Sequence, residues 1–185
     1  LLLGTVHMEL ENWSLASSNF TSVRQSGGPL ASYGAWFEAL MDHKRGRHHV
    51  AIKECKSYRV EWPEGPEADE CLLLIGDAYS AEGARNASVN SYYAYLNRNP
   101  DTPRKEEIRL AIALADLRSD PKRGIESLHA LALHHNYPST DLAIQREIAA
   151  LEEQGFDAAV PTDARSMRSR CESLRRSGQL EDAWD

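Results

Sequence analysis

The sequence lacks long apolar runs, has few cysteines and carries no excess of positive charge. Its apolar stretches, such as Leu1–Leu3 and Cys71–Ile75, are only a few residues long, too short for a transmembrane helix. The three cysteines, Cys55, Cys71 and Cys171, are an odd number at wide spacing, which suits neither a disulfide framework nor a zinc site. A net charge of −7, from 21 Lys and Arg against 28 Asp and Glu, argues against non-specific binding to nucleic acid or to anionic membranes.

Motifs for catalysis are also missing from the 185 residues. We find no phosphate-binding loop, no paired carboxylates and no arrangement of nucleophile and base, so the sequence predicts a chain that is not an enzyme and needs no cofactor. His43, His48 and His49 flank Gly46 and are expected to be exposed turn residues rather than metal ligands. Two adjacent histidines cannot both face one metal ion from a regular helix.

What the sequence does contain is a repeat. Three pairs of residues are each separated by 37 positions: Gly46 and Gly83, Ala51 and Ser88, and Pro63 and Pro100. A third copy follows, because Pro100 and Pro138 are 38 positions apart. Internal repetition with a period of 20 to 50 residues is typical of proteins built from stacked structural repeats.

Each repeat unit predicts two amphipathic helices joined by a tight turn, because apolar residues recur at helical spacing on both sides of a glycine. Gly46 and Gly83 are expected in the turns, where positive φ is needed. The small residues expected where the helices approach most closely are Ala39, Ala51, Gly76 and Ser88. The prolines are expected to end one unit and begin the next.

The run Gly76-x2-Tyr79-x3-Gly83-x4-Ser88-x3-Tyr92-x2-Tyr95-x4-Pro100 resembles a tetratricopeptide repeat (TPR). The unit ending at Pro63 matches more loosely, since Asp42 stands where the family has an aromatic residue. In the unit ending at Pro138, the turn Ser119-Asp120-Pro121 replaces the glycine. Gly178 belongs to a further partial unit. The resemblance implies an all-α fold, a right-handed superhelical α-solenoid of antiparallel helix hairpins.

The organisation expected from these patterns has four parts. Residues 1–30 form one N-terminal helix, from Val6 to Val23, and a Gly/Pro linker. Residues 31–155 form three hairpin units and a lone helix from Ser139 to Gln154, which Gly155 ends. Residues 156–163 are a linker, and residues 164–185 are a partial repeat unit.

The TPR resemblance implies a non-catalytic scaffold that binds another protein or peptide, or further chain of the same array. In this family the first helix of each hairpin lines the concave face. The resemblance therefore suggests the following groove-lining residues: Glu38, Glu70, Asp77, Arg109 and Asp116. Self-association through an uncapped C-terminal end is a further expectation.

A narrower resemblance gives an alternative. The progression from Pro100 to the Arg168-x-Arg170 segment is similar to the superhelical region of bacterial soluble lytic transglycosylases, which cleave peptidoglycan in the periplasm. Their catalytic Glu-Ser motif is followed by Gly-Leu-Met-Gln. Glu172-Ser173 has no such segment after it, so this chain would be only a non-catalytic arm. The resemblance slightly favours the bacterial periplasm or cell envelope over the cytoplasm.

Overall fold

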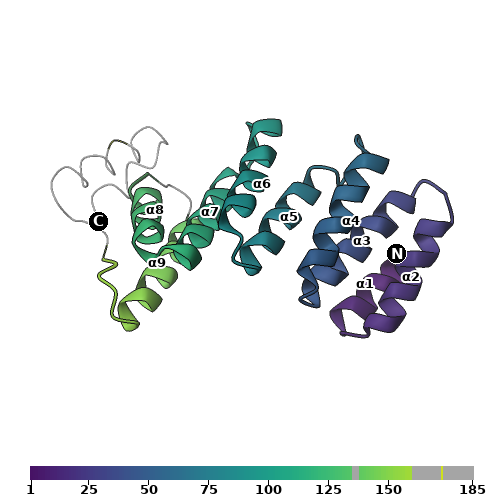
Figure 1. Cartoon of the computed structure of the whole chain (residues 1–185), viewed down its shortest axis with the longest axis horizontal. Coiled ribbons are helices and arrows are strands. Elements are labelled where there is room, and N and C mark those ends of the chain that lie inside the picture. The colour runs from purple at the N-terminus through teal and green to yellow at the C-terminus, as the bar shows by residue number, and fades with distance from the viewer. Residues whose placement is uncertain (135–137, 160–171, 173–185) are drawn as a thin grey trace. The chain divides into compact units, whose positions relative to one another are not determined.

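The computed structural model describes residues 1–134, 138–159 and 172. Over these residues the fold is all-α, with nine helices and no strand. The helices are α1 Leu2–Glu9, α2 Trp13–Gln25, α3 Ala31–Lys44, α4 His48–Glu61, α5 Glu70–Ala81, α6 Arg85–Arg98, α7 Lys105–Ser119, α8 Pro121–His134 and α9 Pro138–Glu153 (Figure 1). The chain divides into two compact units, residues 1–100 and residues 101–185.

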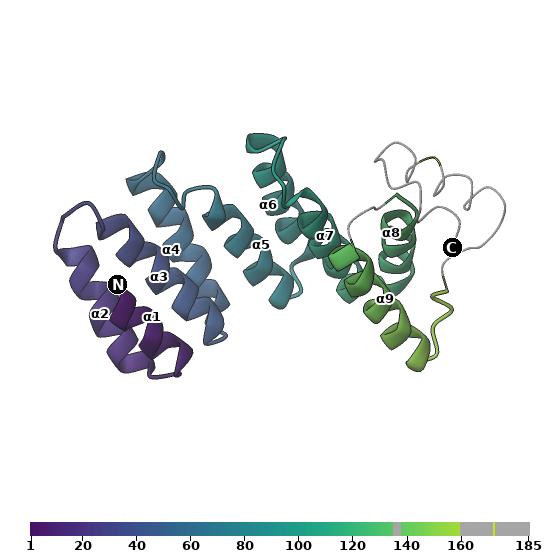
Figure 2. The same ribbon diagram turned by 180° about the vertical axis from the view of Figure 1, so that it is seen from behind.

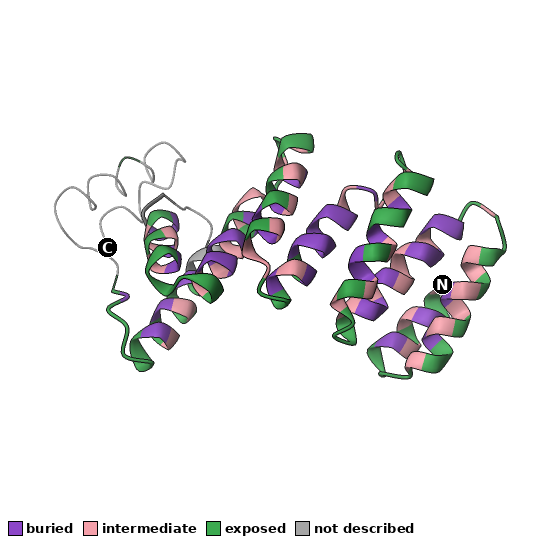
Figure 3. Ribbon diagram, in the orientation of Figure 1, coloured by how far each residue is buried: buried purple, intermediate pink, exposed green. Residues whose placement is uncertain are grey.

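In the first unit, each of the helices α1 to α5 packs against the next one along the chain. Figures 1 and 2 show α1 beside α2 and α3 beside α4 from opposite sides. Helix α3 also contacts α5, so the first helices of two successive hairpins meet. Helix α5 is buried along most of its length, from Cys71 to Gly76 and again at Ala78 and Ser80 (Figure 3).

The N-terminal segment forms two helices, and the prediction of a single helix from Val6 to Val23 is wrong. The chain turns between α1 and α2, where Glu11 adopts a φ of 56° and the Asn12 N–H donates to the His7 carbonyl at 2.8 Å. Both helices bury apolar residues in one core, made of Met8, Ala16, Phe20 and Met41. The apolar pattern continues across the turn because both helices face that core, so it looks like one helix in the sequence.

The expected hairpin turns are confirmed. Gly46 has a φ of 75° and Gly83 a φ of 73°, and both lie between paired helices. The helix ends also repeat: α4 begins at His48 and α6 at Arg85, 37 positions later, and both are 14 residues long. Pro63 and Pro100 follow the ends of these two helices.

Small residues lie at the helix contacts, as expected. Ala39, Ala51 and Ser88 are buried. A Cβ atom on Gly76 would lie 2.6 Å from the Tyr92 ring, so Gly76 makes room for an aromatic side chain of its own hairpin. Tyr79 instead contacts the preceding hairpin, because its hydroxyl accepts a hydrogen bond from Lys56 Nζ at 2.9 Å.

In the second unit, α7, α8 and α9 contact one another around a separate core. The expected Asp120-Pro121 turn is confirmed, and Pro121 begins α8. Helix α9 begins at Pro138 and ends before Gly155, which has a φ of 86°. Residues 156–159 are not helical, in line with the expected linker, and Ala158 is buried with its carbonyl 2.8 Å from His129 Nε2. The remaining linker residues, Gly178 and most of the partial unit 164–185 lie outside the described residues.

We predict that Ser88→Ala leaves the free energy of unfolding unchanged or raises it by up to about 1 kcal/mol. The Ser88 side chain is fully buried, and its hydroxyl has no hydrogen-bond partner among the described residues. Alanine already occupies the equivalent position of the preceding repeat, Ala51, which makes Ala51→Ser a reciprocal variant. It should lower stability by about 1–2 kcal/mol, because it buries a new hydroxyl. Urea denaturation followed by circular dichroism measures both, and a marked destabilisation by Ser88→Ala would contradict this packing.

Candidate functional site

Two of the carboxylates that were predicted to line a groove accept hydrogen bonds from side chains of their own hairpin. Asp77 Oδ1 accepts a hydrogen bond from the Tyr92 hydroxyl at 2.6 Å. Glu70 Oε1 lies 3.5 Å from the Tyr95 hydroxyl, at the long limit of a hydrogen bond. Both contacts join α5 to α6, so these carboxylates help hold the hairpin together.

In the second unit, Asp116 likewise contacts side chains of the other helix of its hairpin. It is 4% exposed, accepts a hydrogen bond from Ser127 Oγ at 3.2 Å and lies 3.7 Å from Arg123 Nε. Those contacts join α7 to α8. Arg109 forms an ion pair with Glu106 one turn away on the same helix, at 3.2 Å.

Glu38, the remaining predicted residue, links α3 to α2. Its carboxylate accepts from Thr21 Oγ1 at 2.5 Å and from Arg24 Nη1 at 3.0 Å. All five residues therefore have polar partners in their own helix or in a neighbouring helix. Their lining of a shared groove stays a prediction.

Close to Glu38 lies a half-buried carboxylate that the sequence did not single out. Burial, together with the negative charges of Asp42 and Glu38, raises the pKa of Glu54 to about 7, against the opposing effect of Arg24 and Arg47. Glu54 Oε2 is buried and has no hydrogen-bond partner among the described residues. Asp42 itself is 4% exposed and forms an ion pair with Arg47.

The histidines around Gly46 differ from one another. His49 is exposed, as expected. His43 and His48 are half-buried and in contact instead, with ring centroids 4.8 Å apart and Nδ1 atoms 3.2 Å apart. Burial and the nearby His48 lower the pKa of His43, which Asp77 partly offsets. Over residues 1–134, 138–159 and 172, no group of three or more His, Cys, Asp or Glu side chains could hold a metal ion.

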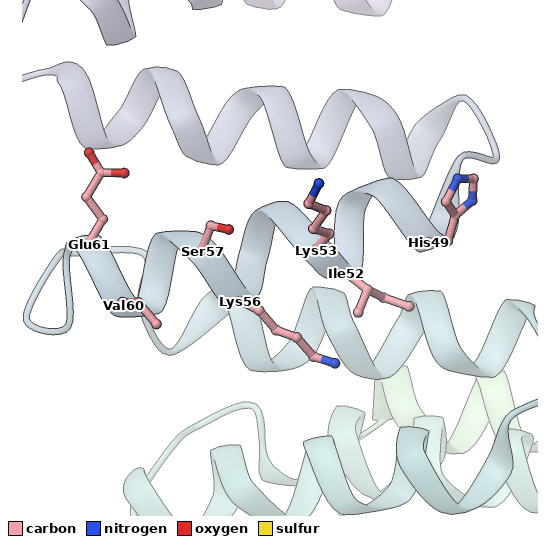
Figure 4. A pocket seen from close by; sticks show the side chains of 7 residues that line it. All are labelled: His49, Ile52, Lys53, Lys56, Ser57, Val60 and Glu61. Atoms are coloured by element: carbon pink, nitrogen blue, oxygen red, sulfur yellow. The ribbon is translucent and has the colours of Figure 1, made fainter.

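The outer face of α4 forms a shallow depression of about 630 Å³, which we call the α4 face. The residues that line it all come from this one helix: His49, Ile52, Lys53, Lys56, Ser57, Val60 and Glu61 (Figure 4). In Figure 4 the side chains of Lys53 and Lys56 extend toward opposite edges of this face. Val60 is 84% exposed, and Ile52 is buried beneath the depression. An open surface of this kind suits contact with another molecule better than enclosure of a small one.

Sequence reasoning missed the α4 face, although a signal for it exists. Lys53, Lys56 and Val60 follow a spacing of three and four residues, which places them along one side of a helix. The groove expected from the TPR resemblance directed attention to the first helix of each hairpin, whereas α4 is a second helix.

Comparison with known proteins gives no family assignment: no protein-family model matches the chain, and no curated protein matches it. None of the helices in the described part of the chain is both long and apolar enough to cross a membrane.

The raised pKa of Glu54 predicts a pH-dependent stability. The folded state favours the protonated carboxyl. Stability should therefore fall as the pH rises from 4.5, the ordinary pKa of a glutamate, to about 7, the pKa of Glu54 in the folded chain. Glu54→Gln removes this titration and should stabilise the chain at pH 8 by on the order of 1 kcal/mol, since the carboxylate is only half buried and water screens the rest. At pH 4 the effect should vanish.

Urea denaturation of the wild-type chain and the variant at the two pH values measures this effect. Glu64→Gln is the matched control, because Glu64 is an exposed carboxylate of the same unit. An equal effect of Glu54→Gln at both pH values would contradict the assigned burial.

Proposed function

We propose that the chain is a TPR-like helical-repeat scaffold, a right-handed superhelical solenoid of hairpins, that binds another protein. Its repetition supports the proposal. Helices α4 and α6 begin and end 37 positions apart, and each follows a glycine with positive φ. Contacts of α5 with both α3 and α4 are those expected when one hairpin stacks on the next.

The proposed binding role rests on the exposed side chains of the α4 face. Many of the polar side chains on the first helices of the hairpins have internal partners, as in the Asp77–Tyr92 and Asp116–Ser127 hydrogen bonds. The α4 face, in contrast, presents exposed lysines next to an exposed valine. A surface that combines apolar and charged groups without chemistry of its own fits recognition of another macromolecule.

Affinity capture tests this function. The intact chain, immobilised at one terminus, is exposed to an extract of the organism that makes it. We expect one or a few proteins to be retained reproducibly, to be displaced by an excess of the soluble chain, and to co-elute with it from a sizing column at a fixed ratio.

The control uses isolated peptidoglycan in a sedimentation assay with the same chain. The scaffold function would be contradicted if the chain sediments with peptidoglycan and the capture experiment yields no protein that the soluble chain can displace. That result would favour the alternative, the non-catalytic arm of a peptidoglycan-cleaving enzyme.

A further inference from the structure

The α4 face differs in charge from the equivalent face of the next repeat. The positions of Lys53 and Lys56 on α4 are occupied 37 residues later, on α6, by Asn90 and Tyr93. A positive face is therefore a property of α4 and not of the repeat. The chain as a whole has a net charge of −7, so overall charge does not account for these lysines either.

Most other cations near α4 are paired with carboxylates. Lys44 lies 2.7 Å from Glu9, Arg47 pairs with Asp42, and Arg24 contacts both Glu38 and Glu61. These cations therefore add little positive charge around the α4 face.

The face also carries the carboxylate of Glu61, which lies 3.6 Å from Arg24, whereas its two lysines have no carboxylate partner in the described part of the chain. Lys53 is exposed and forms no ion pair within the described part of the chain. Lys56 Nζ donates to the Tyr79 hydroxyl at 2.9 Å and lies 5.4 Å from the centroid of that ring. This neutral partner orients the ammonium group without neutralising it. The N-terminal end of α4, near His49, adds the positive end of the helix dipole.

An apolar side chain completes the face. Val60 is 84% exposed and lies two helical turns beyond Lys53, which is about 10 Å along the axis at 1.5 Å per residue. An extended peptide covers that distance in about three residues. Because one helix alone forms the depression, it has no groove in which a second helix could lie, and an extended segment fits it better.

We propose that the α4 face binds an extended, acidic segment of the partner protein, whose carboxylates contact Lys53 and Lys56 and whose apolar residue, about three positions away, packs on Val60. This inference rests on the proposed scaffold function and names the chemistry of its partner. Nucleic acid is disfavoured because it needs many phosphate contacts, and the face supplies two lysines.

The probe is a fluorescein-labelled peptide of about twelve residues that contains Glu-Glu and, about three positions later, Leu in an otherwise Ser/Ala sequence. Fluorescence anisotropy with the intact chain should show saturable binding. A matched peptide with Gln-Gln should bind at least about tenfold more weakly, and salt should weaken the acidic peptide severalfold.

Variants locate the site. The double variant Lys53→Glu, Lys56→Glu should weaken binding of the acidic peptide at least about tenfold, whereas Lys53→Arg, Lys56→Arg should retain most of it. Asn90→Glu introduces a carboxylate at the position of α6 equivalent to Lys53 and should alter binding less than about twofold. Circular dichroism verifies that each variant is folded.

Equal binding of the two peptides, or an equal loss in Asn90→Glu, would overturn the proposal. So would stronger binding of a single-stranded oligonucleotide than of the acidic peptide. The scaffold function is judged separately with the captured partner. If wild-type chain and the Lys→Glu double variant retain that partner equally, the scaffold function stands and the α4 face is not its site. If neither retains any protein, the scaffold function itself fails.

Discussion

The close approach of neighbouring helices, at residues too small to hold them apart, is the constraint on which this fold depends. In the first unit it is clear at Gly34, where a Cβ atom would lie 2.7 Å from the backbone nitrogen of Arg24 and 2.8 Å from the carbonyl oxygen of Phe20. Helix α3 therefore packs directly on the backbone of α2. At Gly124, a Cβ atom would overlap the backbone of Leu117, so the same constraint joins α8 to α7 in the second unit. Backbone atoms cannot move aside as a flexible side chain can.

This close packing also determines where polar side chains go. When two helices lie close together, a carboxylate next to their contact is drawn out of water and needs a hydrogen-bond donor from the partner helix. Tyr92 supplies one to Asp77, and Ser127 supplies one to Asp116. Polar side chains on the outer side of the second helix meet no such demand. Lys53 and Val60 of α4 are therefore exposed.

The repeat could be predicted from the sequence because its marks are local. Positive φ at Gly46 and Gly83, and the small side chains of Ala51 and Ser88, follow from spacing alone. The break between α1 and α2 could not, because Glu11 adopts positive φ without being glycine and the apolar pattern continues on both sides of it. The partners of Asp77 and Asp116 were also missed. Helical periodicity says which residues share a face, but not which neighbouring helix that face meets.

The free energy of unfolding of Gly34→Ala shows whether neighbouring helices pack in direct contact through small residues. Gly28→Ala is the control, because a Cβ atom there would meet only Ser26 Oγ at 3.7 Å. We expect Gly34→Ala to lower the free energy of unfolding by about 2–3 kcal/mol, as overpacking does, and Gly28→Ala to change it by less than about 0.5 kcal/mol. A Gly34→Ala chain as stable as the wild type would contradict the close packing of α3 on α2.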